Sequence, residues 1–213
     1  MILTMAGRSI GYVWIAHVSL TTLRNLLSLS MLSIVNAFQS HSKPLTKVLF
    51  FPDKKIACKS FMKTKKCAAK DCHFSHEETS LTLLLTCLAS SRKSLDVCVF
   101  TITSQDLADV LIQQHKAGIV VRVITDCEKM DLNCSQIERF RASGIQVRHD
   151  KTSYFMHHKF AIVDKKVLIN GSFNWTRQAI TGNQENVIIT EAVDLIKPYC
   201  KQFEHLWETY KPE

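Results

Sequence analysis

Two histidines and a lysine stand together at the start of a short apolar run. His157, His158 and Lys159 lead into residues 160–163, and such a run is typical of a buried strand. Because alternate side chains of a strand share a face, we expect His157 and Lys159 to point together and His158 to turn inward. A histidine can attack or donate a proton near neutral pH, and a neighbouring lysine can hold a phosphate oxygen. The pair therefore favours phosphoryl chemistry.

A second polar group should return to the same place. The apolar segments on either side of residues 164–166 predict a hairpin, which would bring Ser172 and Asn174 back toward His157. Gly171 permits close approach of the backbone, and the serine and the asparagine supply neutral hydrogen-bond donors.

The complete array resembles the signature of the phospholipase D superfamily. The match rests on His157, Lys159, Asp164, Gly171, Ser172 and Asn174, and Glu185 falls where such proteins carry a glutamate that orients the histidine. VRHD, MHHKFAIVD, LINGSFNWT and ENVIIT are similar to the cardiolipin hydrolase and endonuclease branch, over roughly residues 48 to 210. Asp164 either holds the hairpin turn or neutralises a histidine in the cleft, and we expect it to support the catalytic pair.

This resemblance implies a fold and a mechanism. The fold is an α/β arrangement of a mixed sheet flanked by helices, and the reaction passes through a covalent phosphohistidine without a catalytic metal. His157 would attack, Lys159 would grip the phosphate, and Ser172, Asn174 and Glu185 would support them. Members use two copies of the signature, whereas this chain has one. The resemblance therefore implies a homodimer whose two His157 side chains face one cleft.

The pattern of elements before the signature agrees with that fold class. Apolar strands predicted at 94–103, 119–125 and 145–150 alternate with helices at 104–117 and 135–143. This spacing predicts parallel strands with right-handed crossovers. We also expect a helix over 78–92 that is capped by Thr79 or Ser80, a strand at 187–190 and a closing helix over 191–210.

Three cysteines and a histidine lie in a short lysine-rich run, and their spacing suits closed tetrahedral zinc. The expected ligands within this finger, residues 54–78, are Cys58, Cys67, Cys72 and His76. The spacing resembles Cys-Cys-Cys-His fingers of RNA-binding proteins, with His73 as an alternative ligand and incidental buried cysteines as the other explanation. The other five of the eight cysteines are scattered, and because a disulfide framework would space its cysteines more evenly in a shorter chain, the usage indicates a reducing compartment.

Basic side chains crowd this finger. With Phe61 and Phe74 between them, they compose a surface for single-stranded RNA or a solvated face whose rings pack beneath the finger. The seven are Lys54, Lys55, Lys59, Lys63, Lys65, Lys66 and Lys70. The net charge of +8 also favours polyanionic partners.

An apolar segment precedes the predicted catalytic domain. Residues 10–38 are long enough to span a bilayer, with Arg24 and Asn25 as interruptions. We expect residues 1–42 to be a membrane anchor, with a targeting peptide, an interfacial helix or a buried helix as alternatives. The lysines that follow place residues 43–213 on the cytosolic side, and the resemblance suggests the mitochondrial outer membrane.

These observations predict a phosphodiesterase. The basic finger favours a single-strand-specific endoribonuclease that leaves 5′-phosphate ends, and the resemblance implies a role in piRNA biogenesis. The alternative is a phospholipase that converts cardiolipin to phosphatidic acid, and a third hypothesis is an inactive scaffold for RNA or proteins.

Overall fold

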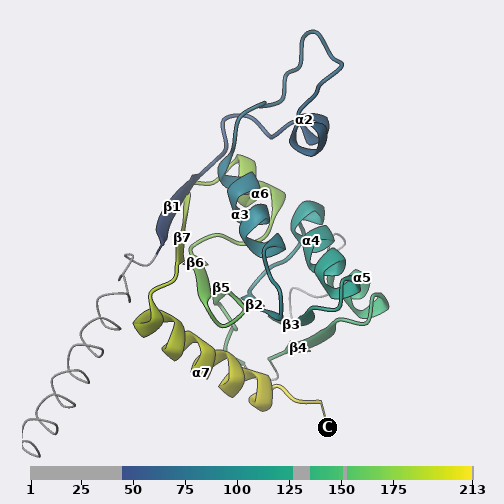
Figure 1. Cartoon of the computed structure of the whole chain (residues 1–213). Coiled ribbons are helices and arrows are strands. Elements are labelled where there is room, and N and C mark those ends of the chain that lie inside the picture. Colours follow the sequence, from purple (N-terminus) through teal and green to yellow (C-terminus); the bar gives the residue numbers. More distant parts are fainter. Residues whose placement is uncertain (1–44, 127–134, 151–152, 213) are drawn as a thin grey trace, which may run out of the picture. The chain divides into compact units, whose positions relative to one another are not determined.

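The computed structural model describes residues 45–126, 135–150 and 153–212. Within these residues seven strands form one mixed sheet in the order β1-β7-β6-β5-β2-β3-β4 (Figure 1). The strands are β1 (Thr46–Phe51), β2 (Ser94–Val99), β3 (Val120–Thr125), β4 (Gln146–His149), β5 (Lys159–Val163), β6 (Val167–Gly171) and β7 (Glu185–Thr190).

Helices cover both faces of the sheet. In the described part of the chain they are α2 (Lys59–Thr64), α3 (Ser80–Ala89), α4 (Gln105–Lys116), α5 (Ile137–Ala142), α6 (Arg177–Thr181) and α7 (Val193–Thr209). Helices α3 and α4 pack on one face, and α7 packs on the other. The architecture is therefore three layers, as expected of a mixed sheet flanked by helices.

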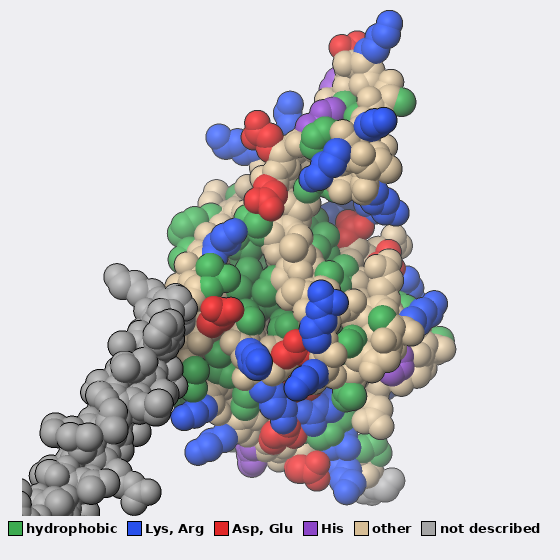
Figure 2. Space-filling model, in the orientation of Figure 1, with side chains coloured by type: hydrophobic (Ala, Val, Ile, Leu, Met, Phe, Trp, Pro, Cys, Tyr) green, Lys and Arg blue, Asp and Glu red, His purple; other side chains and the backbone are tan. Residues whose placement is uncertain are grey.

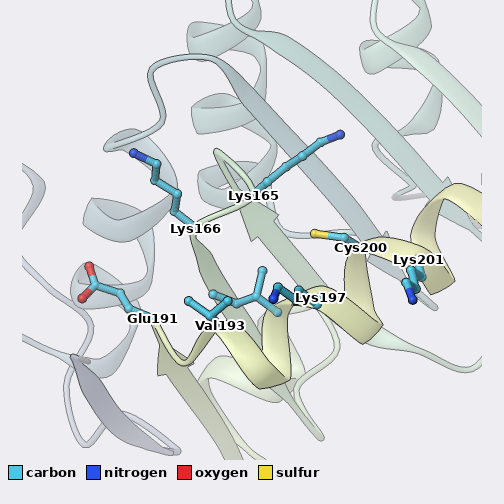
Figure 3. Close-up of a pocket in the computed structure, with 8 residues that line it drawn as sticks. Lys165, Lys166, Glu191, Val193, Lys197, Cys200 and Lys201 are labelled. Atoms are coloured by element: carbon cyan, nitrogen blue, oxygen red, sulfur yellow. The ribbon is translucent and has the colours of Figure 1, made fainter. Parts of the chain in front are cut away.

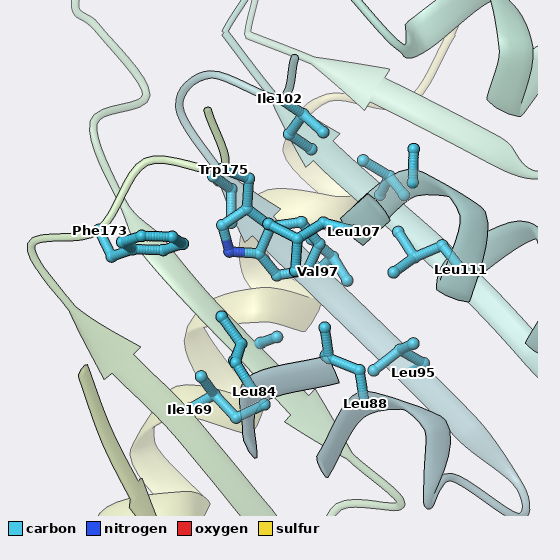
Figure 4. Packing of buried hydrophobic residues seen from close by; sticks show 14 of the residues in the cluster. Leu84, Leu88, Leu95, Val97, Ile102, Leu107, Leu111, Ile169, Phe173 and Trp175 are labelled. Atoms are coloured by element: carbon cyan, nitrogen blue, oxygen red, sulfur yellow. The ribbon is translucent and has the colours of Figure 1, made fainter. Parts of the chain in front are cut away.

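The larger core lies between α3, α4 and the sheet. Leu84 and Leu88 of α3 meet Leu107 and Leu111 of α4 above Val97 of β2, and all five side chains are fully buried (Figure 4). Burial of each leucine contributes about 1.5–3 kcal/mol. This core fixes the strands whose ends carry the polar residues.

The opposite face is held by an aromatic and ionic attachment of α7. Arg122 of β3 bonds Asp96 of β2 at 2.7 Å and Glu204 of α7 at 2.8 Å. Its guanidinium also lies 4.8 Å from the ring centroid of Phe203 and 5.2 Å from that of Trp207. Bidentate pairing and stacking suit arginine in a partly buried site, so α7 has a defined position on the sheet.

The parallel part of the predicted sheet is confirmed. Strand β2 pairs in parallel with β3, and β3 with β4, while β5, β6, β7 and β1 add antiparallel pairs. The cap at Thr79 is present as a capping box with Thr82. Gly118 and Gly144 end their helices with φ of +88° and +84°, which glycine adopts readily.

Other expectations needed correction. Helix α3 spans Ser80–Ala89 and is shorter than 78–92 at both ends. The short elements β1, α2 and α6 were not predicted, because their periodic patterns are too brief. Strand β1 pairs with β7 along one edge.

The predicted anchor, residues 1–42, lies outside the described residues. Among the described residues, none of the helices combines the length and the apolar composition needed to cross a bilayer.

Candidate active site

Three antiparallel strands bring polar residues to one end of the sheet. Strand β5 begins at Lys159, β6 ends at Gly171 and β7 begins at Glu185, and the register of the two pairs places these ends side by side. His157 lies two residues before β5, and Asn174 lies three residues after β6. The hairpin therefore brings together residues that are far apart in the signature.

His157 and Lys159 are in direct contact. Lys159 Nζ lies 3.1 Å from Nδ1 of His157 and donates to the His157 carbonyl oxygen at 2.8 Å. The Phe100 ring lies beside both: its centroid is 4.6 Å from that of His157 and 5.0 Å from Lys159 Nζ. The shared face predicted for the pair is confirmed, and the imidazole is exposed to solvent.

The environment of Lys159 weakens its hold on its proton. Partial burial lowers the pKa of Lys159 below its ordinary value, and the negative charge of Glu185 opposes this shift. An incoming phosphate anion would act in the same direction as Glu185. The lysine is therefore suited to respond to a bound phosphodiester.

A short hydrogen-bond network holds Glu185. Ser172 Oγ donates to one carboxylate oxygen and Asn183 Nδ2 donates to the other at 2.9 Å, while the Asn186 backbone N–H donates to Ser172 Oγ at 3.2 Å. Gly171 permits this arrangement, since a Cβ there would lie 2.0 Å from the Asn186 carbonyl oxygen. A larger residue would push β6 away from β7.

Asn174 lacks a partner for its amide oxygen. Its Oδ1 is enclosed and makes no hydrogen bond within the described residues. Leaving such a group unsatisfied costs about 1–3 kcal/mol, and these groups concentrate where a ligand or a reaction needs them. Asn174 Oδ1 is therefore free to accept a hydrogen bond that the described residues do not supply.

His158 differs from its predicted environment. It lies on the Phe160 side of the strand, with ring centroids 5.5 Å apart, but its side chain is exposed rather than turned inward. His158 precedes the first residue of β5. The alternation of side chains therefore sets its direction, but the sheet does not cover it. Partial desolvation, followed by the charges of Lys159 and His157, lowers the pKa of His158.

Asp164 is not brought into this group. It lies in the β5–β6 turn, at the other end of β5, about 17 Å along the strand from Lys159. Its carboxylate accepts backbone N–H bonds of 2.7–3.1 Å from Arg92, Lys93 and Ser94. Of the two roles that the sequence left open, the structure shows the one that holds the turn.

The finger residues form a separate cluster. The four ligand atoms of Cys58, Cys67, Cys72 and His76 lie within 4.8 Å of one another. The Cys58 and Cys67 sulfurs are 3.8 Å apart, as for two sulfurs about 2.3 Å from one tetrahedral zinc, whereas a disulfide would bring them to about 2.0 Å. The predicted donor set therefore fits a structural zinc ion, and His73 is not part of the cluster.

The finger lysines all lie on its surface. All seven are exposed (Figure 2), and Lys59 forms an ion pair with Asp106 of α4 at 2.6 Å. Phe61 stacks on His76 with centroids 4.6 Å apart, while Phe74 is 54% exposed. One aromatic ring thus packs within the finger, and one is presented to solvent among positive charges.

Two residues of the site escaped the sequence analysis. Phe100 follows β2 and looks like one more core residue, and Asn183 precedes β7 in a loop. No spacing rule links Phe100 to the signature, since it meets His157 only through a tertiary contact. The position of Asn183 two residues before Glu185 is a usable signal, because a turn can bring such neighbours together.

The geometry agrees with the family comparison. The family described as "Cardiolipin synthase, PLD-like domain" matches residues 84–207, more than half of the chain. The chain belongs to the phospholipase D superfamily. As a member of this superfamily, it is a phosphodiesterase.

Curated relatives and solved structures extend this result. The chain is 46% identical to a protein named mitochondrial cardiolipin hydrolase from Chlamydomonas reinhardtii, covering 78% of this chain and 75% of the relative. A mouse protein of the same name is 44% identical, covering 80% and 79%. The phospholipase D family member Nuc from Salmonella typhimurium superposes with a TM-score of 0.64 at 22% identity, covering 79% and 97%. The last similarity concerns the fold.

Proposed function

We propose that this chain hydrolyses the phosphodiester of cardiolipin to release phosphatidic acid, with His157 as the nucleophile. The observation that carries the proposal is the contact between the exposed His157 and the half-buried Lys159, whose side-chain nitrogens lie 3.1 Å apart, with the negative charge of Glu185 acting on the lysine. The lysine-rich finger alone favoured RNA. The name shared by relatives of 40–46% identity favours the lipid.

The reaction has two balanced steps. First, a ring nitrogen of His157 forms a bond to phosphorus while the bond to the leaving alkoxide breaks, and a second imidazolium protonates that alkoxide. Next, the second imidazole takes a proton from water, the water oxygen bonds to phosphorus and His157 leaves. Lys159 and the Asn174 amide stabilise the charge on the non-bridging oxygens, so these steps use side chains of the protein alone.

The contact between Lys159 and His157 sets a condition on the first step. Attack through Nε2 requires the proton of a neutral imidazole to reside on Nδ1. An ammonium group cannot accept that proton, so Lys159 must turn its donors from Nδ1 toward the phosphate. The anionic substrate favours this exchange of partners, because it attracts the ammonium group.

The second imidazole comes from another copy of the chain in this proposal. One signature is present per chain, and the exposed position of His157 leaves room for a symmetry-related histidine. A two-fold axis at the strand ends would place two histidines on opposite sides of one phosphorus atom. His157 of the partner subunit would then protonate the leaving group.

Single-stranded RNA is the second candidate substrate, and the finger supports it. Exposed lysines around the exposed Phe74 ring combine backbone charge with a stacking surface. Cys58, Cys67, Cys72 and His76 would hold a structural zinc ion that keeps this surface folded. Cleavage would not need the 2′-hydroxyl, since the enzyme supplies its own nucleophile, and it would leave a 5′-phosphate.

The proposed location is the mitochondrial outer membrane. The support is the name of the relatives together with the apolar sequence of residues 10–38 and the lysines after it. The domain that carries His157 would face the cytosol.

A substrate comparison tests the proposal. Purified chain with EDTA in the buffer is given cardiolipin vesicles and, separately, 5′-labelled single-stranded RNA, and its mass is measured by light scattering. We expect phosphatidic acid as product from a dimer. RNA cleavage without lipid hydrolysis would replace cardiolipin with RNA, and inactivity toward both would support a scaffold. Activity of a monomer would contradict the shared site.

A variant of the finger sharpens this comparison. Cys72→Ser should lower bound zinc below the one equivalent expected of the parent chain by metal analysis. If RNA is a substrate, its cleavage should fall about tenfold, while hydrolysis of a small soluble phosphodiester stays the same. Equal metal content in both proteins would reject the zinc site.

A further inference from the structure

A cavity lies at the end of the sheet opposite His157. Its volume is about 590 Å³, a size typical of small-ligand sites. The β5–β6 turn forms one wall and the N-terminal half of α7 forms the other (Figure 3). It is lined by Lys165, Lys166, Glu191, Val193, Ile196, Lys197, Cys200 and Lys201.

The lining is basic at the rim and apolar beneath. The four lysines are exposed, and Glu191 is the one acidic residue in the lining; Lys165 also lies 3.5 Å from Glu204. The buried Ile196 and the half-buried Cys200 supply apolar surface below them, and the exposed Val193 continues this surface outward. Figure 2 shows basic side chains gathered over this end of the molecule. Such a lining suits an amphiphilic anion.

Two exposed apolar side chains extend the surface outward. Val193 and Leu195, in the first turn of α7, are 57% and 53% exposed. Together with Lys197 they give the start of α7 the composition of a helix that lies on an anionic membrane, where lysines meet phosphate and apolar side chains enter the headgroup layer.

The path of the chain connects this cavity with the N-terminal apolar segment. The Glu191 backbone N–H donates to the Leu45 carbonyl oxygen at 2.9 Å, and the Leu45 N–H donates to the Glu191 carboxylate at 3.1 Å. Leu45 therefore lies at the rim. In the sequence, the apolar segment ends at Phe38, seven residues before Leu45.

We propose that this cavity binds the phosphate headgroup of an anionic phospholipid in the membrane that holds residues 10–38. The inference rests on the proposed anchor. Each lysine near an anionic surface strengthens binding by about fivefold. The site is distinct from the active site, because Lys165 and His157 lie beyond opposite ends of β5, whose five residues span about 17 Å.

Hydrogen exchange on vesicles tests this proposal. Full-length chain carrying His157→Asn, which prevents turnover, is bound to vesicles of phosphatidylcholine with or without phosphatidylglycerol. We expect amides of residues 164–167 and 193–201 to exchange more slowly with phosphatidylglycerol present. Replacing Lys165, Lys166, Lys197 and Lys201 by glutamine should abolish this protection, whereas glutamine at Lys63, Lys65, Lys66 and Lys70 of the distant finger should preserve it.

Flotation of the same samples separates the two proposals. If the chain floats with vesicles with and without phosphatidylglycerol but its amides exchange equally fast on both, the anchor is supported and the cavity proposal is overturned. Chain that floats only with phosphatidylglycerol, with residues 193–201 protected, supports the cavity and overturns the anchor. Loss of protection in the finger variant, or protection of these amides by RNA without vesicles, would also overturn the lipid assignment. Thermal unfolding of both four-lysine variants checks that each is folded.

Discussion

The two ends of strand β5 carry parts of one sequence signature but do different work. At the start of the strand, His157 is exposed and touches Lys159 at 3.1 Å, near an Asn174 amide oxygen without a hydrogen bond in the described chain. At the other end, Asp164 makes four hydrogen-bond contacts to the backbone that precedes β2. The Asn174 amide oxygen at one end accepts no hydrogen bond from the described residues. The Asp164 carboxylate at the other end accepts several.

The signature therefore contains residues of two kinds: candidate catalytic side chains, and a residue that shapes the β5–β6 turn. The turn at Asp164 and Lys165 has positive φ at both residues, 53° and 55°, and a Lys166 N–H bond to the Val163 carbonyl oxygen. These features define the tight turn that sets the hairpin register. The register in turn places Gly171 beside the start of β7. The aspartate therefore belongs to the turn that fixes the register of β5 and β6.

Replacing the proposed nucleophile should have the largest effect of these substitutions. The effect should fall on the rate of hydrolysis and not on stability. We expect His157→Asn to lower hydrolysis roughly 10⁴-fold, about 5 kcal/mol of transition-state stabilisation, with an unchanged melting temperature because the side chain is exposed. Initial rates and thermal unfolding of the same preparation measure the two quantities.

The adjacent histidine supplies the matched control. His158→Asn changes the same side chain one residue away, on the opposite face of the strand, and should alter the rate only a few-fold. Equal losses in both variants would mean that the imidazole at 157 is not the nucleophile.

Much of this division was predictable from the residues. The alternation of side chains along 157–160 placed His157 with Lys159, and the apolar segments around 164–166 announced the hairpin. The strands and helices over 94–150 were long and periodic, so their parallel pairing followed from spacing alone. The cysteine spacing likewise identified the finger cluster, because all its ligands are local in sequence.

What could not be predicted depended on contacts between distant segments. Phe100 looks like an ordinary strand residue until the fold places its ring against His157. Asp164 was equally suited to a turn or a cleft until the backbone of Arg92–Ser94 reached it. The basic cavity joins a turn to a helix about thirty residues later, and no local pattern signals that pairing.

A change at the end of β6 should affect both chemistry and stability. Gly171→Ala places a Cβ 2.0 Å from the Asn186 carbonyl oxygen, so β6 and β7 must separate. We expect about 2–4 kcal/mol of destabilisation and a rate about 100-fold lower, since Ser172 and Glu185 move together. Denaturant unfolding and initial rates give both values.

Gly182→Ala is the control for the change in stability, because the nearest atoms to its added Cβ belong to the Gln178 side chain, which can move aside. Gln178 also donates to Asn183, so this variant is compared by unfolding and not by rate. We expect a smaller loss of stability there. Normal activity in Gly171→Ala would show that the close pairing of β6 and β7 does not set the active-site geometry.

The smallest effect on stability and rate should come from a substitution at Asp164, in the β5–β6 turn. Asp164→Asn removes the charge but keeps an acceptor oxygen, so we expect about 1 kcal/mol of destabilisation, reduced by the solvent exposure of the carboxylate. Hydrolysis measured well below the melting temperature should stay within a few-fold of the parent rate. A loss comparable with that of His157→Asn would place the aspartate in the chemistry and erase the contrast between the two ends.

The pH dependence of this effect distinguishes the charge from the packing. Partial burial raises the pKa of Asp164, but N–H bonds from Ser94, Lys93 and Arg92 outweigh it and leave the pKa below its ordinary value. The carboxylate therefore stabilises the fold above the ordinary aspartate pKa of about 4, and this contribution disappears as pH falls through the lowered pKa. The difference in unfolding free energy between parent and Asp164→Asn should shrink on acidification. A difference that stays constant into acid would mean that the side chain acts through shape, since an amide and a protonated carboxyl occupy similar space.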